Sequence, residues 1–298
     1  MKLWLILLFS SLSFHSTAQG AACCGGGFAT PSIIAGDDKA QLTTSYSYSL
    51  VVVDNVDSNG IWRTWDDHQK VQTFRMEGAH LISDRWQVGG SIPVIQRSQL
   101  DQNYSGLGDI SGNLAFEYLP DWNYNPFRPK GIGYLQITLP TGKSKVESEV
   151  GGLDSRGNGL WVIGIGTLLT KTIGRWDFFS NIEVHRSFEK RVSNSQFNGS
   201  LKPGIGSKYG FGGGFNTASW RFGASVTWSY EDATKVEGTT GATGLVEQYT
   251  TSVFSASYLV GNDWAGTFNY SDQTLLGRPV NTSLGRAVGL QLQKRWGR

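Results

Sequence analysis

The clearest pattern along the chain is the alternation of apolar and polar side chains. From Trp220 to Tyr230, large apolar or alanine side chains occupy every second position, and small or polar residues fill the positions between them. Successive side chains of a strand point to opposite faces, so this segment predicts a strand with one apolar and one polar face. Similar runs predict about twelve strands in all: residues 41–53, 71–82, 86–97, 109–119, 131–140, 159–170, 175–188, 200–215, 219–231, 248–260, 264–273 and 285–296.

Tryptophan marks the same end of several predicted hairpins. Four short polar turns lead straight into Trp86, Trp176, Trp220 and Trp264. The indole ring is apolar but its N–H needs a polar partner, which makes tryptophan typical of a membrane–water interface. The segment after Trp220 has Trp228 and Tyr230 at its far end. This arrangement indicates two interfacial girdles, one of them formed by Trp86, Trp176, Trp220, Trp264 and Trp296.

The connections between the predicted strands alternate in length. The Trp turns are short, with the link from Pro120 to Lys130 as their longest member, and the other connections are long and polar: 54–70, 98–108, 141–158, 189–199, 232–247 and 274–284. Short periplasmic turns and long extracellular loops are typical of outer-membrane barrels. An even strand count then places both termini in the periplasm.

The fold class predicted from these patterns is all-β, a closed antiparallel transmembrane β-barrel of about twelve strands. An open sheet in lipid would leave its edge N–H and C=O groups unpaired, so the first and last strands should pair. The alternative is a soluble β-sandwich that buries the same apolar faces in its core.

The N-terminus predicts export. Lys2, an apolar run from Leu3 to Phe9 and small residues up to Ala18 match a secretory signal peptide over residues 1–20. We expect residues 21–39 to form a flexible segment that partly plugs the lumen, and residues 40–298 to form the barrel. No later run is apolar enough for a membrane-spanning helix, and the mean hydropathy is -0.25. The expected location is therefore the outer membrane of a Gram-negative bacterium.

Composition excludes several other classes of protein. Glycine is abundant, at 39 of 298 residues. The net charge is only +2, so no nucleic-acid partner is expected. The only two cysteines, Cys23 and Cys24, form neither a disulfide framework nor a zinc site. Lipidation of Cys23 and a disulfide to a second chain remain open. The acidic residues Asp54, Asp57, Asp66 and Asp67 match no calcium-loop spacing, and we expect neither metal nor cofactor.

Two short motifs carry a resemblance to a known family. Gly106-Leu107-Gly108-Asp109 leads into a predicted strand, and Leu139-Pro140-Thr141-Gly142-Lys143 ends the next one. Together with the Trp turns, they resemble the outer-membrane phenol-degradation meta-pathway transporters over most of residues 40–298. The resemblance implies passage of small, hydrophobic or aromatic solutes. The chain departs from most outer-membrane barrels by ending in Trp296-Gly297-Arg298 instead of an aromatic residue.

The polar faces of the strands supply the candidate lumen-lining residues: Arg75, Glu77, Glu117, Asp177, Glu183, His185, Lys202, Lys208, Arg221 and Arg295. Both signs are nearly balanced, which argues against strong ion selectivity, because pores select with a ring of one sign. These charges could equally pair with one another and stiffen the wall. Gly204, Gly206, Gly210, Gly212 and Gly214 also point inward by alternation, which leaves room for solute, an inward-folded loop or the N-terminal segment. We favour the N-terminal segment.

An enzyme is not expected. Barrel phospholipases use a Ser, His and Asn set, and no His-x-Ser-Asn-Gly type of motif surrounds His68, His80 or His185. The predicted function is an outer-membrane channel or transporter for small solutes. Its expected partners are outer-membrane lipid, the solute and the barrel assembly machinery. The alternative function is a structural or adhesive barrel with a filled lumen.

Overall fold

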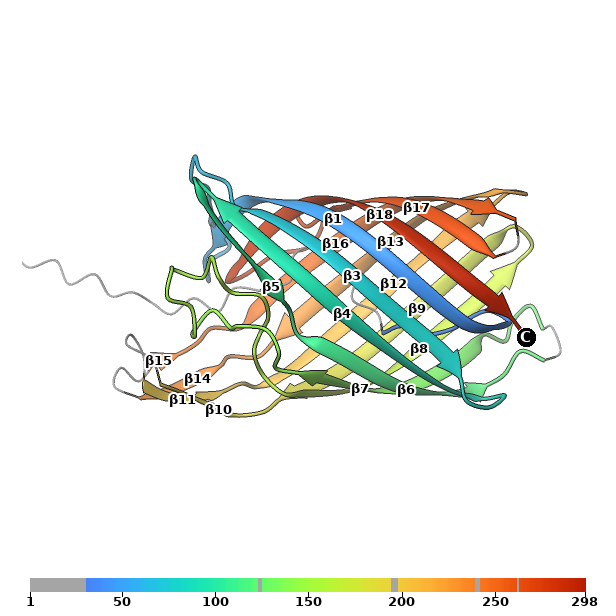
Figure 1. Cartoon of the computed structure of the whole chain (residues 1–298), viewed down its shortest axis with the longest axis horizontal. Helices are drawn as coiled ribbons and strands as arrows, with labels where there is room; N and C mark the ends of the chain where they lie inside the picture. Colours follow the sequence, from blue (N-terminus) through green and yellow to red (C-terminus); the bar gives the residue numbers. More distant parts are fainter. Residues whose placement is uncertain (1–30, 123–124, 194–197, 239–241, 262) are drawn as a thin grey trace, which may run out of the picture.

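The protein is a closed β-barrel (Figure 1). The computed structural model describes residues 31–122, 125–193, 198–238, 242–261 and 263–298. Twelve long antiparallel strands form the wall: β1 (Asp38–Val56), β3 (Lys70–Leu81), β4 (Trp86–Gln99), β6 (Ile110–Leu119), β7 (Lys130–Leu139), β8 (Val162–Ile173), β9 (Trp176–Ser187), β12 (Ile205–Asn216), β13 (Trp220–Glu231), β16 (Glu247–Val260), β17 (Trp264–Asp272) and β18 (Thr282–Gly297). β1 pairs with β18 over most of its length, so the sheet has no open edge around its circumference.

The outer face of the wall is apolar. Phe211, Phe222 and Leu290 are 54%, 53% and 61% exposed, respectively, and many other large apolar side chains lie exposed on the same surface. Neighbouring aromatic rings stack across strands on this face, as Phe211 and Trp228 do at 5.4 Å between ring centroids. A sandwich would bury these side chains between two sheets, whereas the buried set here includes Gln87, Glu183 and Asp272. The barrel prediction is confirmed and the sandwich is not.

The predicted strands agree with the observed wall, with three differences. The strand predicted over 159–170 is β8, which begins at Val162. The strand predicted over 200–215 is divided between β11 (Asn198–Lys202) and β12. The long connections, which were predicted to be loops, also contain the short strands β2 (Trp62–Arg63), β5 (Gln102–Leu107), β10 (Lys190–Ser193), β14 (Lys235–Gly238) and β15 (Ala242–Thr243).

The short strands β10, β11, β14 and β15 form a separate sheet at the end of the barrel that carries the long connections. Its strand order is β10-β11-β14-β15 (Figure 1). The C-terminus lies at the opposite end, where the turns are short. By the general rule for bacterial barrels, the short turns face the periplasm and the long connections face the exterior.

The described part of the chain contains no helix that is long and apolar enough to cross a membrane. The predicted signal peptide, Cys23 and Cys24 lie outside the described residues.

Candidate functional site

The polar faces of the strands line the interior of the barrel, and ion pairs organise the charges there. One cavity of about 210 Å³ lies between Arg75 and Glu77 on β3 and Glu183 and His185 on β9. Arg75 lies 3.7 Å from Glu77. Within this cavity, the polar wall offers both signs of charge at close range.

His185 joins two carboxylates across the strands. Its Nε2 lies 2.8 Å from Glu231, and its Nδ1 lies 3.4 Å from Glu183. Glu183 is almost fully buried, lies 3.7 Å from Lys208, and accepts a hydrogen bond from the Tyr134 hydroxyl. A buried carboxylate needs such partners, because an unpaired charge in this position would be costly. The network fixes the side chains of β7, β9, β12 and β13 against one another.

Other predicted lumen residues are paired as well. Glu117 lies 3.2 Å from Lys130, and the guanidinium of Arg221 donates two hydrogen bonds to Asp177. Arg295 lies 3.9 Å from Asp38. Lys202 lies elsewhere: it belongs to β11 and pairs with Glu237 on the external sheet, so the prediction that it lines the barrel wall is wrong. The physical reason is the break in the strand at Pro203 and Gly204, which ends the sheet before β12 begins.

Among the described residues, the glycines of β12 make room for side chains of neighbouring strands. A Cβ at Gly206 would meet the ring of His185 within 2.2 Å. A Cβ at Gly212 would approach the ring of Phe179, and one at Gly214 would meet Arg221. The expectation that these glycines mark the approach of the N-terminal segment stays a prediction, because the segment's first residues lie outside the described part of the chain.

The described N-terminal residues instead lie against β4 and β6. The Gln87 amide holds the backbone of Ile34 from both sides, accepting from its N–H at 2.6 Å and donating to its C=O at 3.2 Å. Asn113 donates to the carbonyl of Ser32 at 3.2 Å. Gly89 permits this contact, since a Cβ there would lie 2.2 Å from the Ser32 carbonyl oxygen. Residues 32–34 are thus fixed to the inner wall by hydrogen bonds between their backbone and side-chain amides of the wall.

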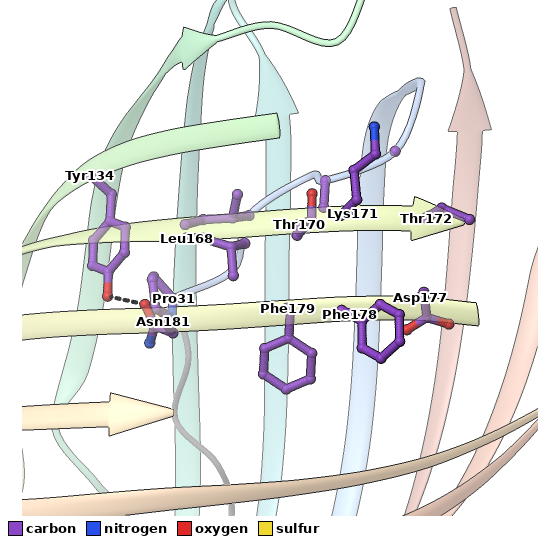
Figure 2. Close-up of a pocket in the computed structure, with 13 residues that line it drawn as sticks. Pro31, Tyr134, Leu168, Thr170, Lys171, Thr172, Asp177, Phe178, Phe179 and Asn181 are labelled. Atoms are coloured by element: carbon purple, nitrogen blue, oxygen red, sulfur yellow. Dashed lines mark hydrogen bonds between the residues drawn. The ribbon is translucent and has the colours of Figure 1, made fainter. Parts of the chain in front are cut away.

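A second cavity of about 450 Å³ lies between this segment and strands β7 to β9. Its apolar lining includes Pro31 and Ile33 from the segment and Leu168 and Phe179 from the wall (Figure 2). Its polar lining includes Thr170, Lys171, Thr172 and Asp177, and the Tyr134 hydroxyl donates to Asn181 at one side of the cavity (Figure 2). Pro31 and the Tyr134–Asn181–Glu183 hydrogen bonds connect this cavity with the polar one.

The two motifs singled out in the sequence meet where β6 leaves β5. The Thr141 hydroxyl donates to Gly108 C=O at 2.6 Å and accepts from Ile110 N–H at 3.0 Å. The Asp109 carboxylate accepts backbone N–H groups of Gly142, Asn158 and Gly159. This junction fixes both ends of the β7–β8 loop, residues 140–161, and turns part of it toward the lumen.

Ion pairs fasten the remainder of the β7–β8 loop. Lys143 pairs with Asp154, and Glu147 pairs with Lys190 at 2.6 Å. The hydrogen bond from Lys143 to Asp154 raises the pKa of Lys143. Burial raises the pKa of Glu147, but hydrogen bonds from Lys190 and Ser144 outweigh it and hold that pKa below its ordinary value. Asp154 behaves in the same way, with Lys143 and Ser148 as its donors, and its pKa is lowered.

The members of the predicted girdle lie exposed near the short-turn end. Trp86, Trp176, Trp220, Trp264 and Trp296 are between 41% and 53% exposed. Trp220 packs against Tyr258 of the adjacent strand, with 4.8 Å between the ring centroids. Exposed indoles that pack against neighbouring aromatic rings on the outer wall suit the boundary between lipid tails and water.

Sequence reasoning missed several lumen residues because they lie in loops or make contacts that alternation does not encode. Arg156, Asp109 and Glu231 line the polar cavity, and none was a candidate. Gln87 was also missed. Among the described residues, no group of three or more His, Cys, Asp or Glu side chains is placed to hold a metal ion.

Comparison with known proteins supports the architecture. No protein-family model matches the chain. The COG4313 outer membrane channel from Pseudomonas putida F1 superimposes with a TM-score of 0.69 at 12% identity, over 87% of this chain and 96% of that one. The protein is a bacterial outer-membrane β-barrel. A porin, NanC, also aligns over 85% of this chain and 98% of its own, at 9% identity and a TM-score of 0.48.

These likenesses bear on the fold of the barrel. The outer-membrane part of the predicted resemblance is confirmed, while membership of the phenol-degradation family stays a prediction. The two solved structures above are described as a channel and a porin, neither as an enzyme.

Proposed function

We propose that this outer-membrane barrel is a channel for small solutes and that it favours solutes with an apolar or aromatic ring. The observation that carries the proposal is the apolar cavity of about 450 Å³ inside a wall that is otherwise polar. Binding sites for small molecules have volumes of about 300–1,000 Å³ and combine apolar walls with a few polar groups. Phe179, Leu168 and Ile33 supply apolar walls, and Asn181, Tyr134, Lys171 and Asp177 are among the polar groups.

A structural barrel would have no need of such a cavity. The wall residues Arg75, His185 and Lys208 of the polar cavity are paired with carboxylates, which supports a stiff wall in either role. A continuous path from the polar cavity to the apolar one is what distinguishes a channel, because solute must leave the first site in order to reach the second. Pro31 lines both cavities, which supports such a path.

We also propose that the N-terminal segment partly plugs the lumen. Ile34 is 2% exposed, and the segment closes one side of the apolar cavity. Four hydrogen bonds attach residues 32–34 to Gln41, Gln87 and Asn113. A segment that binds through side chains of the wall, without pairing as a strand, can leave without opening the barrel.

Block of ion current tests the solute preference. Phenol and a sugar of similar size are added separately to the protein in a planar bilayer, and Phe179→Ala serves as the cavity variant. We expect phenol to reduce the current of the wild type and to act about two- to tenfold more weakly on Phe179→Ala, since an aromatic contact contributes about 0.5–1.5 kcal/mol beyond its area. Equal block by both solutes would remove the ring preference, and an absence of any current would favour the structural barrel.

A further inference from the structure

The β7–β8 loop brings one cation into the lumen that the wall does not neutralise. Arg156 lines the polar cavity together with Arg75, Lys208 and His185. Those three side chains each have a carboxylate partner, namely Glu77, Glu183 and the pair Glu183 and Glu231. Within the described residues, no carboxylate lies within ion-pair distance of Arg156. It is therefore the exception among the basic groups of this cavity.

The hydrogen bonding of Arg156 is also incomplete. Its Nη1 donates to the backbone carbonyl of Ser105 at 2.9 Å. Its Nε is buried and has no hydrogen-bond partner in the described structure. A guanidinium presents five N–H donors in a planar fork that matches a carboxylate, so most of its capacity is unused here.

The surrounding backbone fixes where this side chain lies. Gly106 leaves the space for it, because a Cβ there would lie 2.2 Å from Nη1. The backbone N–H of Arg156 donates to the Lys143 carbonyl at 2.8 Å, and Asp109 holds the adjacent Asn158. The nearest acidic group of this junction, Asp109, is already occupied by three backbone N–H donors. The motifs around Gly106 and Thr141 thus position the Arg156 guanidinium.

We propose that Arg156 is the anion-binding residue of the lumen and that the channel takes small organic monoanions, such as aromatic carboxylates, in preference to their neutral counterparts. This proposal rests on the channel function above and names its substrate class. A carboxylate would supply the negative partner that the wall lacks, through charge-assisted hydrogen bonds. The ring of such a solute would suit the apolar cavity that follows.

Benzoate is the probe, and benzyl alcohol is its uncharged counterpart of similar size. Binding to the purified full chain in detergent is measured by isothermal titration calorimetry, and current block is measured in planar bilayers. The variants are Arg156→Gln, which removes the charge, Arg156→Lys, which keeps it, and Lys202→Gln, a matched control outside the barrel wall. Heat-dependent mobility on gels verifies that each variant folds.

We expect Arg156→Gln to weaken benzoate binding at least about tenfold, the range for a hydrogen bond to a charged group. Arg156→Lys, which keeps the charge but loses the planar fork, should bind benzoate more tightly than Arg156→Gln and more weakly than the wild type, and Lys202→Gln should match the wild type. Benzyl alcohol should bind equally to all four proteins. Equal benzoate affinity in the wild type and Arg156→Gln, or no benzoate binding by the wild type, would overturn the proposal.

The two measurements separate this proposal from the channel function. Arg156-dependent benzoate binding without any current would refute the channel and keep the anion site. Current with no dependence of benzoate binding or block on Arg156 would keep the channel and refute the anion site.

Discussion

The side-chain amide of Gln87 forms hydrogen bonds to the backbone of Ile34 with both of its polar atoms. Oε1 accepts from the Ile34 N–H at 2.6 Å, and Nε2 donates to the Ile34 carbonyl at 3.2 Å. Both residues are 2% exposed. The amide thus takes the place that a neighbouring strand would have, and it binds the N-terminal segment to the inner wall of β4.

Replacing Gln87 with alanine should loosen this segment. Each lost hydrogen bond contributes about 0.5–1.5 kcal/mol, and the backbone groups of Ile34 would be left buried without partners. We expect a higher mean single-channel conductance and more frequent steps between two levels. Gln291→Ala on β18 is the matched control, as it shortens a half-buried wall residue that makes no hydrogen bond to residues 32–34 in the described structure. Identical conductance of Gln87→Ala, Gln291→Ala and the wild type would contradict the proposed plug.

Gly89→Val tests whether the N-terminal segment or the wall limits the pore, because the two cases predict opposite changes in conductance. The added side chain would occupy the position of the Ser32 carbonyl oxygen, so the segment must move away. If the segment is the obstacle, this larger residue should raise conductance; if the wall alone limits the pore, it should lower it. Single-channel recording of Gly89→Val beside Gly89→Ala would measure the direction.

The β7–β8 loop should open in acid. Glu147 and Asp154 have lowered pKa values, so they stabilise the folded loop above their ordinary values of 4.5 and 3.8. That stabilisation is lost as the pH falls through the lower pKa values of the folded state. Lys143 has a raised pKa, so its contribution is complete below 10.5 and is lost as the pH rises through the raised value. The loop should therefore remain fastened from about pH 5 to about pH 10.

A spin label reports this opening. The label is attached at Glu149→Cys in a chain with Cys23 and Cys24 changed to serine, and its mobility is followed by electron paramagnetic resonance from pH 7 to pH 3. The control label at Asp101→Cys lies on the exposed β4–β5 turn. We expect only the label at position 149 to become more mobile below pH 4 or so. Equal responses at both positions would show that the ion pairs do not fasten the loop.

Asp109→Ala should release the base of the same loop. The change leaves three backbone N–H groups without their acceptor, two of them part-buried, and each lost hydrogen bond contributes about 0.5–1.5 kcal/mol. Trypsin should then cleave faster after Lys145 and Arg156 at neutral pH. Asp101→Ala, on the exposed turn, should be cleaved at the wild-type rate. Unchanged cleavage of Asp109→Ala would mean that the junction of the two motifs does not position the loop.

The wall of the barrel could be predicted from the sequence because membrane strands repeat one physical constraint. Lipid selects an apolar side chain at every second position, so the runs after Trp86, Trp176, Trp220 and Trp264 all carry the same signal. The external sheet of β10, β11, β14 and β15 carries no such signal, since water surrounds it and strands of two to five residues show too little alternation.

The candidate site could be predicted only in part. Alternation placed Arg75, Glu183, His185 and Lys208 on the inner face, where they form ion pairs. Alternation does not apply to Arg156, because a loop folds it into the lumen. Among the described residues, side chains of neighbouring strands approach the β12 glycines, and the sequence could not identify them, since a missing side chain marks a close approach without identifying the group that approaches.

Single-channel recording in planar lipid bilayers tests the central claim most directly. The purified wild type and a variant lacking residues 21–38 are compared at equal protein amounts. The account predicts discrete conductance steps for the wild type and larger steps for the deletion, because the lumen is open to ions and the N-terminal segment narrows it. A folded deletion variant that inserts into the bilayer and passes no ions would contradict it.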